Sequence, residues 1–253
     1  MITLDDEELI WNIYKNTPSY KVKYIGNFFR CMRIDILTRS KLFSKSWINS
    51  SSKADLPPDF HNNKHKIMME FMRVDDSSKK CKNNSFKRQN SILKKCFGKN
   101  DRNDLTFFCL PNTNNNIDFN YKGYIQNFER VVNKHAQKAD NYKKNYPNCK
   151  SLVFFICDES NNYMEVANKE DLCEKEIYKN FKFHYSYLDK KILEIVKNCN
   201  ADFVIWLGLY KKIYLNNKEV KCPRVVIYDL KNINFEGINY NSDLMLKITK
   251  EII

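Results

Sequence analysis

The sequence of 253 residues is poor in glycine and proline, with 5 Gly and 6 Pro. So few of either leave little material for a loop-built or disordered fold. No stretch reaches the roughly 18 to 20 consecutive apolar residues that cross a bilayer. The first eight residues, MITLDDEE, are acidic rather than basic and apolar, unlike a secretory signal. We therefore expect a folded cytoplasmic protein that makes no membrane contact.

Several short motifs are also missing. The chain has no Gly-x-Ser-x-Gly elbow, no GxxxxGK[ST] loop and no glycine-rich dinucleotide loop. Hydrolase elbows, P-loop chemistry and Rossmann-type cofactor binding thus have no motif support. The nine cysteines form no CxxC pair. An odd, scattered set of this kind is typical of reduced thiols rather than of a disulfide framework.

Positive charge is abundant and unevenly distributed. Residues 1–102 hold 21 Lys and Arg against 11 Asp and Glu, whereas residues 103–253 hold 22 against 19. This asymmetry indicates an anionic partner near the N-terminal region. DNA or RNA is the favoured partner and an acidic protein surface is the alternative, because charge steering does not depend on which polymer carries the negative charge.

Two basic blocks account for most of this excess. Residues 15–53 carry nine basic residues against one acid, and residues 77–102 carry nine against one. Within them, the predicted nucleic-acid-binding residues are Arg30, Arg33, Arg39, Lys87, Arg88, Lys94 and Lys95. Aromatic residues are interleaved with cations in YKVKY (20–24) and FFR (28–30), where they could stack on bases. Their helical spacing favours burial in the core instead.

The apolar patterns predict a mixed α+β protein. Helices are expected over about 4–15, 20–42, 60–74 and 85–97, giving a basic helical region over residues 1–102. From residue 103 the apolar runs 105–111, 151–158, 163–167, 201–210 and 220–231 are of strand type, and helices are expected over about 124–142, 187–198 and 242–253. Residues 103–253 thus form an α/β core domain, a central mixed sheet of about five strands flanked by helices.

Two predicted pairings complete this sheet. YMEVA (163–167) is expected to form a hairpin with SLVFFICD (151–158), and residues 201–210 to pair antiparallel with residues 220–231 across an Asn-rich turn. The helical region would pack on this core or extend from it.

The strongest candidate for chemistry is RVVIYDLK (224–231). In a strand, Asp229 and Lys231 would project from the same side. SLVFFICD also ends in an acid, Asp158, and strand ends position site residues rigidly. The sequence therefore predicts a Mg²⁺ or Mn²⁺ site held by Asp158 and Asp229, with Lys231 positioning phosphate or water. Glu159 or Glu165 would assist, and Glu70 could complete the shell.

This arrangement is similar to that of restriction-endonuclease-like enzymes, in which a strand-borne acid-x-Lys works beside a second strand-borne Asp. The second acid is not unique, since Asp158, Glu165 and Asp202 are all candidates. Two functional hypotheses follow. The first is a nucleic-acid-interacting protein with a divalent-metal nuclease site. The second is a non-enzymatic binder or inhibitor whose basic helices bind nucleic acid or an acidic protein.

Overall fold

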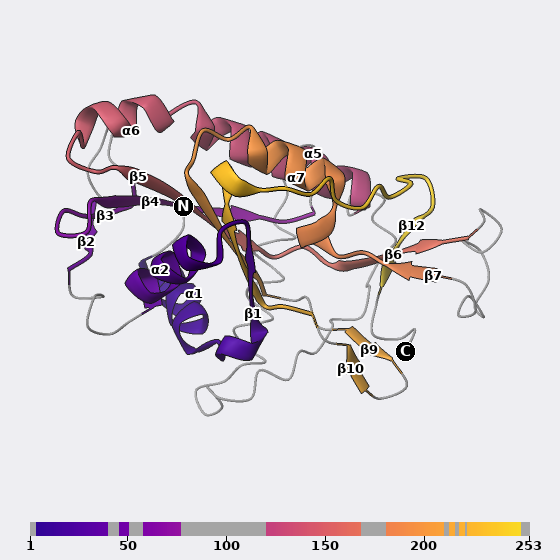
Figure 1. Cartoon of the computed structure of the whole chain (residues 1–253). Coiled ribbons are helices and arrows are strands. Elements are labelled where there is room, and N and C mark those ends of the chain that lie inside the picture. Colours follow the sequence, from indigo (N-terminus) through magenta and orange to yellow (C-terminus); the bar gives the residue numbers. More distant parts are fainter. Residues whose placement is uncertain are drawn as a thin grey trace.

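A seven-stranded mixed sheet lies between two groups of helices in the computed structural model (Figure 1). The structure describes residues 4–39, 46–50, 58–76, 120–167, 181–209, 213–215, 218–220 and 222–248. The predicted mixed α/β class is confirmed, with more strands than expected. The strands of this sheet are β1 (Val22–Ile25), β2 (Ile48–Asn49), β3 (Phe60–Asn62), β4 (Ile67–Val74), β5 (Ser151–Asp158), β8 (Phe203–Gly208) and β11 (Val225–Asp229).

The strand order is β1-β11-β8-β5-β4-β3-β2. The central strands β4, β5 and β8 are parallel, whereas β11 runs antiparallel to β8 and β1 runs parallel to β11. One end of the sheet is therefore formed by the first residues of β4, β5 and β8 together with the last residues of β1 and β11. The opposite end holds the last residues of the three central strands.

Helices cover both faces of the sheet. α1 (Leu4–Asn16) and α2 (Phe28–Arg39) pack on one face, and α5 (Tyr121–Ala136), α6 (Ala139–Asn145) and α7 (Lys190–Lys197) pack on the other. Alternate residues of β5 face the two helical layers, so SLVFFIC is apolar at almost every position. None of the described helices combines the length and the apolar character needed to cross a membrane.

Smaller elements surround this core. A three-stranded sheet has the order β12-β6-β7, and β9 pairs with β10 as a hairpin. Their bounds, with those of the 3₁₀ helices, are β6 (Asn162–Val166), β7 (Phe181–Phe183), β9 (Ile213–Leu215), β10 (Lys218–Val220), β12 (Met245–Ile248), η1 (Ser19–Lys21), η3 (Ser186–Leu188) and η4 (Leu230–Asn232).

The predicted helix over 60–74 is wrong, because these residues form β3 and β4. β4 lies between β3 and β5 and is buried on both faces, so its run IMMEFMRV carries no strand period that the sequence could reveal. Glu70 therefore lies on a strand rather than on a helix. The predicted helix over 20–42 begins only at Phe28, after η1 and β1.

Two further expectations are corrected. YMEVA does not pair with β5, because β6 pairs with β7 and β12 in the smaller sheet. The expected helix over 242–253 is in part strand β12. Strands from both sides of residue 102 share the seven-stranded sheet, so the described N-terminal part is not an all-helical region. The expected helix over 85–97 and strand over 105–111 lie outside the described residues.

Candidate nucleic-acid interface

The two predicted metal ligands, Asp158 and Asp229, do not lie together. Asp229 pairs with Phe203, which pairs with Val153, five positions before Asp158. Five residues of strand span about 16 Å. The side chains also project from opposite faces, since Asp158 contacts α5 and Asp229 contacts α2. The predicted site of Asp158, Asp229 and Lys231 therefore does not form.

Asp158 is instead a buried structural carboxylate. It accepts hydrogen bonds from the Tyr124 hydroxyl at 2.8 Å and from the backbone N–H of Ser160 at 2.9 Å. Glu165 lies on β6 in the smaller sheet, 3.6 Å from Lys182 Nζ. Among the described residues, no group of three or more His, Cys, Asp or Glu side chains is arranged to hold a metal ion.

β11 stops at Asp229, and η4 then turns Lys231 away from the strand. Asp229 Oδ2 accepts a hydrogen bond from Asn232 Nδ2 at 2.6 Å and lies 3.3 Å from Arg30 Nε. Lys231 Nζ lies 2.7 Å from Asp202 Oδ1. The expectation that one strand carries both Asp229 and Lys231 is thus wrong, yet the sheet does bring Asp202 to the same end.

Cations from separate chain segments gather at this end of the sheet. Lys66 and Lys150 directly precede the paired strands β4 and β5, and Lys66 O accepts a hydrogen bond from Lys150 N at 2.8 Å. Lys143 Nζ donates to Asn200 O, just before β8. We call this end, with its seven cations, the basic end; they are Arg30, Arg33, Lys64, Lys66, Lys143, Lys150 and Lys231.

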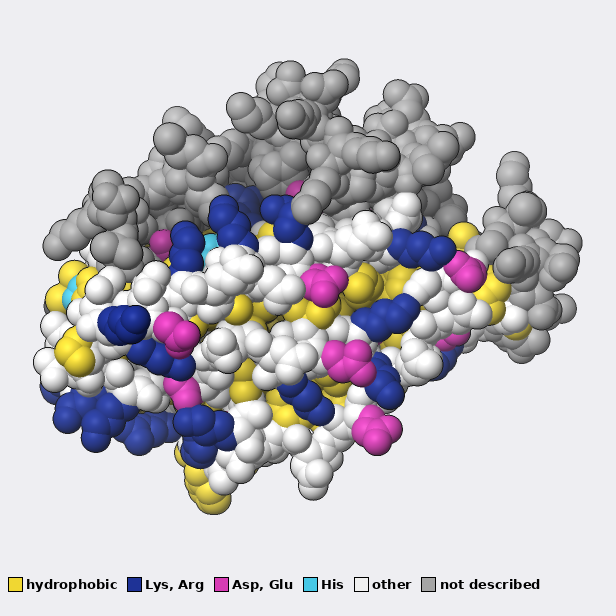
Figure 2. Space-filling view, turned by 90° about the horizontal axis from the view of Figure 1, so that it is seen from above, with side chains coloured by type: hydrophobic (Ala, Val, Ile, Leu, Met, Phe, Trp, Pro, Cys, Tyr) yellow, Lys and Arg dark blue, Asp and Glu magenta, His cyan; other side chains and the backbone are white. Residues whose placement is uncertain are grey.

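Arg33 and Lys64 both lie close enough to His65 for their charges to act on it. Burial lowers the pKa of His65, and the positive charges of Lys64 and Arg33 lower it further. The acids that pair with the cations of this end, Asp202 and Asp229, are both buried. Figure 2 shows a group of Lys and Arg side chains, with some acidic ones among them, at the end where α6 lies.

Two exposed aromatic side chains lie beside the basic end, and a third lies at the start of β1. Phe28 and Phe29, in the first turn of α2, are 54% and 73% exposed, and their ring centroids lie 5.6 Å apart. Tyr20, at the other end of β1, is 81% exposed. The predicted burial of these three rings is wrong, because the inner face of α2 is supplied by Cys31, Ile34 and Leu37.

Arg39 does not belong to the basic end. Its Nε lies 2.7 Å from Asp35 Oδ1, it donates to the Thr17 carbonyl, and its side chain is only 14% exposed. The guanidinium also lies 4.8 Å from the centroid of the Tyr14 ring. Arg39 thus connects α2 to α1 rather than facing a partner. Lys87, Arg88, Lys94 and Lys95 lie outside the described residues.

A group of acids lies at the opposite end of the sheet. Asp75, Asp76, Asp158 and Glu159 follow or end the parallel strands β4 and β5. Each has a polar partner, as in the 2.7 Å hydrogen bond from the Tyr163 hydroxyl to Asp76. Burial raises the pKa of Glu159 to about 7, against the opposing effect of Arg73. Arg73, Arg224 and Lys21 lie at this end too, so the acids there stand beside cations.

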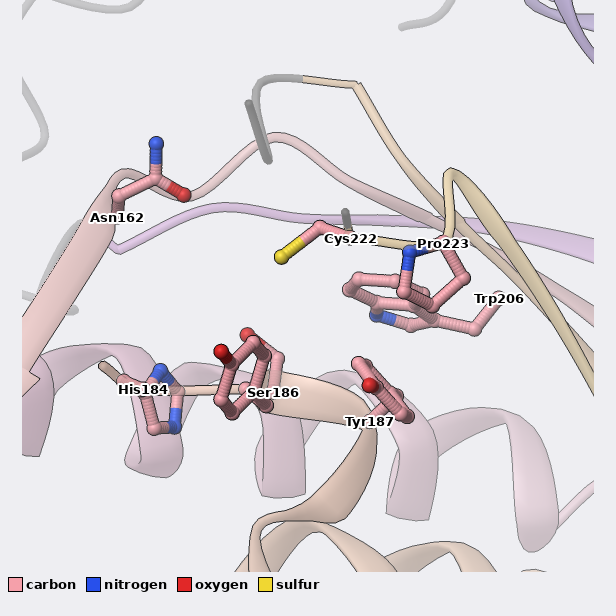
Figure 3. Close-up of a pocket in the computed structure, with 8 residues that line it drawn as sticks. Asn162, His184, Ser186, Tyr187, Trp206, Cys222 and Pro223 are labelled. Atoms are coloured by element: carbon pink, nitrogen blue, oxygen red, sulfur yellow. The ribbon is translucent and has the colours of Figure 1, made fainter. Parts of the chain in front are cut away.

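One small pocket lies between η3 and β8 (Figure 3). It has room for about one water molecule. Trp206 Nε1, which lines it, is buried and has no hydrogen-bond partner among the described residues. The pocket as it stands is too small for a nucleotide or a metabolite, so it does not serve as the candidate site. Its lining residues are Asn162, His184, Tyr185, Ser186, Tyr187, Trp206, Cys222 and Pro223.

No protein family model, no curated protein and no solved structure matches the chain. The functional argument therefore depends on the side chains and their geometry. Sequence reasoning missed Lys64, Lys66, Lys143 and Lys150. A signal was present, because a lysine directly precedes each of the apolar runs IMMEF and SLVFF, and strands that lie side by side bring such flanking residues together.

Proposed function

We propose that this protein binds nucleic acid at the basic end of its sheet. The observation that carries the proposal is the convergence there of seven cations from five chain segments, beside two exposed aromatic rings. Nucleic acids release condensed counterions when cations neutralise their phosphates, which drives binding irrespective of sequence.

Among the cations of the basic end, Arg30 has the side chain that is best positioned to contact a phosphate. Its Nε faces the buried carboxylate of Asp229, while 41% of its side chain remains exposed. A guanidinium that is already held in place loses less conformational freedom when it binds phosphate. Arg33 lies on the next turn of the same helix and is exposed. Two of the predicted nucleic-acid contacts, Arg30 and Arg33, are therefore retained in the proposal.

The test compares two double substitutions that each remove two positive charges. Lys66→Ala/Lys150→Ala removes two cations from the basic end, whereas Lys122→Ala/Lys182→Ala removes two that pair with Asp243 and Glu165 near the smaller sheet. We expect the first variant to bind a fluorescent oligonucleotide at least about tenfold more weakly, and the second to bind nearly as the wild type does. Equal effects, or no binding by the wild type, would contradict the proposal. Binding of an acidic protein but not of DNA or RNA would favour the alternative partner.

A second candidate function is divalent-metal-dependent cleavage at the same end. The contact between Lys231 and Asp202 favours it, because it gathers Asp202, Asp229 and Lys231 near the basic end. Asp229 Oδ1 is buried without a hydrogen-bond partner among the described residues, which fits an additional ligand. Mg²⁺ is often held by one or two carboxylates together with substrate phosphates. Asp202 and Asp229 would hold the ion, which would stabilise the charge that develops on phosphate.

This second candidate has its own test. Wild-type protein would cut DNA or RNA with Mg²⁺ or Mn²⁺ and not with EDTA. Asp202→Asn would abolish cutting while binding persists. The folded fraction of Asp158→Asn would still cut. Cutting by Asp202→Asn at the wild-type rate, or no cutting by wild-type protein with either metal, would refute the candidate while leaving the binding proposal intact.

A further inference from the structure

The geometry points to single-stranded nucleic acid as the ligand class, with Phe28 and Phe29 stacking on unpaired bases. This inference rests on the proposed function and specifies its substrate. Its starting observation is the exposure of two neighbouring phenylalanine rings, 54% and 73%, on a described surface where most large apolar side chains are buried. Exposed aromatic area is costly in water and is typical of a contact surface.

The two rings belong to a short aromatic row. Tyr24 and Phe28 have ring centroids 5.3 Å apart, and Phe28 and Phe29 lie 5.6 Å apart, both in edge-to-face geometry. Tyr24 is fixed at the inner end, because its hydroxyl donates to Asp35 Oδ2 at 2.8 Å. Phe28 is thus supported by a ring that is itself held in place, which lowers the side-chain freedom that Phe28 loses on binding.

Cations lie directly beside this row. Arg30 follows Phe29 in the chain, and its guanidinium lies 5.1 Å from the centroid of the buried Phe203 ring. Arg33 is one helical turn beyond Phe29, which is about 6 Å along the axis. An aromatic platform with guanidinium groups at its border matches a strand whose bases stack while its phosphates pair with the arginines. The same border fits an apolar protein segment poorly, because docking would desolvate these charges.

Base accessibility decides between single and double strands. The bases of a duplex are already stacked on one another, and opening a step costs free energy. In a single strand the faces of the bases are available, and each base that stacks on an aromatic side chain strengthens binding. Phe28 and Phe29 would therefore strengthen binding to single strands and contribute little to duplex binding.

The experiment measures affinity for a fluorescent single strand and for the duplex of the same sequence. Phe28→Ala/Phe29→Ala should bind the single strand about 10- to 100-fold more weakly and the duplex almost as the wild type does. Phe28→Trp/Phe29→Trp should restore single-strand binding. Ile36→Ala is the matched control, because Ile36 is a 47% exposed apolar residue of the same helix. It should leave both affinities unchanged.

The outcomes separate this inference from the proposed function. If wild-type protein binds and Phe28→Ala/Phe29→Ala binds the single strand equally well, the stacking role is refuted while nucleic-acid binding stands. An equal loss from Ile36→Ala would also refute it, because α2 would then act as a general apolar surface. If the wild type binds no nucleic acid at all, the proposed function fails first. A thermal melt of each variant identifies losses that come from unfolding.

Discussion

Arg30 Nε lies 3.3 Å from Asp229 Oδ2, so a fully buried carboxylate at the end of β11 holds a half-exposed guanidinium on α2. Gly26 makes this contact possible. It has φ of +101°, and a Cβ at this position would lie 2.9 Å from the Asp229 carbonyl oxygen. Strand β1 can therefore turn directly into α2 beneath the end of β11. Asp229 acts as a positioning residue for Arg30 in the binding proposal.

Asp229→Asn distinguishes positioning from simple electrostatics. The substitution makes the protein more positive by one charge, which alone would strengthen the binding of a polyanion. Loss of the carboxylate should instead leave Arg30 poorly oriented, and we expect weaker binding in an anisotropy titration. Stronger binding than that of the wild type would contradict the positioning role. We also expect about 1–3 kcal/mol lower stability, measured by denaturant unfolding.

Arg33 and Arg39 lie on one helix, and their alanine substitutions can be compared directly. Arg33 is exposed near Lys64, so Arg33→Ala should weaken binding and change stability by less than about 0.5 kcal/mol. Arg39 pairs with Asp35, and Arg39→Ala should cost about 3 kcal/mol of stability because that largely buried carboxylate keeps its tyrosine hydrogen bonds but loses its counter-charge. The folded fraction of Arg39→Ala should bind nearly as the wild type does. Chemical denaturation and anisotropy together test both halves of this prediction, and the reverse pattern would overturn it.

Gly26→Ala should destabilise the protein by about 1–3 kcal/mol, because the left-handed backbone and the nearby Asp229 carbonyl both oppose a Cβ. Chemical denaturation measures this loss. Gly237→Ala is a control of the same kind beside the start of α7, where φ is +84° and Cβ would lie 2.8 Å from Leu188 O. Both should destabilise, but only Gly26→Ala should also weaken binding by its folded fraction.

The raised pKa of Glu159 predicts that the stability of the protein depends on pH. Burial raises its pKa from 4.5 to about 7. The folded state therefore binds the proton more tightly than the unfolded state, so stability falls as pH rises from about 4.5 to about 7 and this contribution is flat outside that window. Glu159→Gln cannot titrate and should lose this fall. The free energy of unfolding measured across pH 4 to 8 tests it; a parallel decline in both proteins would assign the effect to another group.

Much of the second half of the fold could be predicted because its apolar runs are bounded. β5, β8 and β11 and the antiparallel pairing of the last two follow their expected segments closely, whereas the single helix expected over about 124–142 is divided into α5 and α6. β4 could not be recognised, since a strand buried on both faces lacks the alternation that separates it from a helix. β6 was assigned to the wrong partner because its neighbour β12 lies about 80 residues away in the sequence.

For the candidate site too, the sequence predicted local features but not which strand ends meet. Asp158 and Asp229 each end an apolar strand, as predicted, but only the strand directions decide whether two strand ends meet. β5 and β8 are parallel while β11 is antiparallel to both, so the two acids lie at opposite ends. The aromatic residues of FFR were expected in the core because helical spacing does not reveal which side of α2 faces the sheet.

The most direct test of nucleic-acid binding at the basic end is the salt dependence of the dissociation constant for a single-stranded oligonucleotide. For single strands, the slope of log affinity against log salt changes by about 0.7 for each phosphate contact. We predict that Lys66→Ala/Lys150→Ala lowers the magnitude of the wild-type slope by about 1.4, and that Lys122→Ala/Lys182→Ala leaves it unchanged. A wild-type slope in the first variant, or an equal loss in both, would contradict the account.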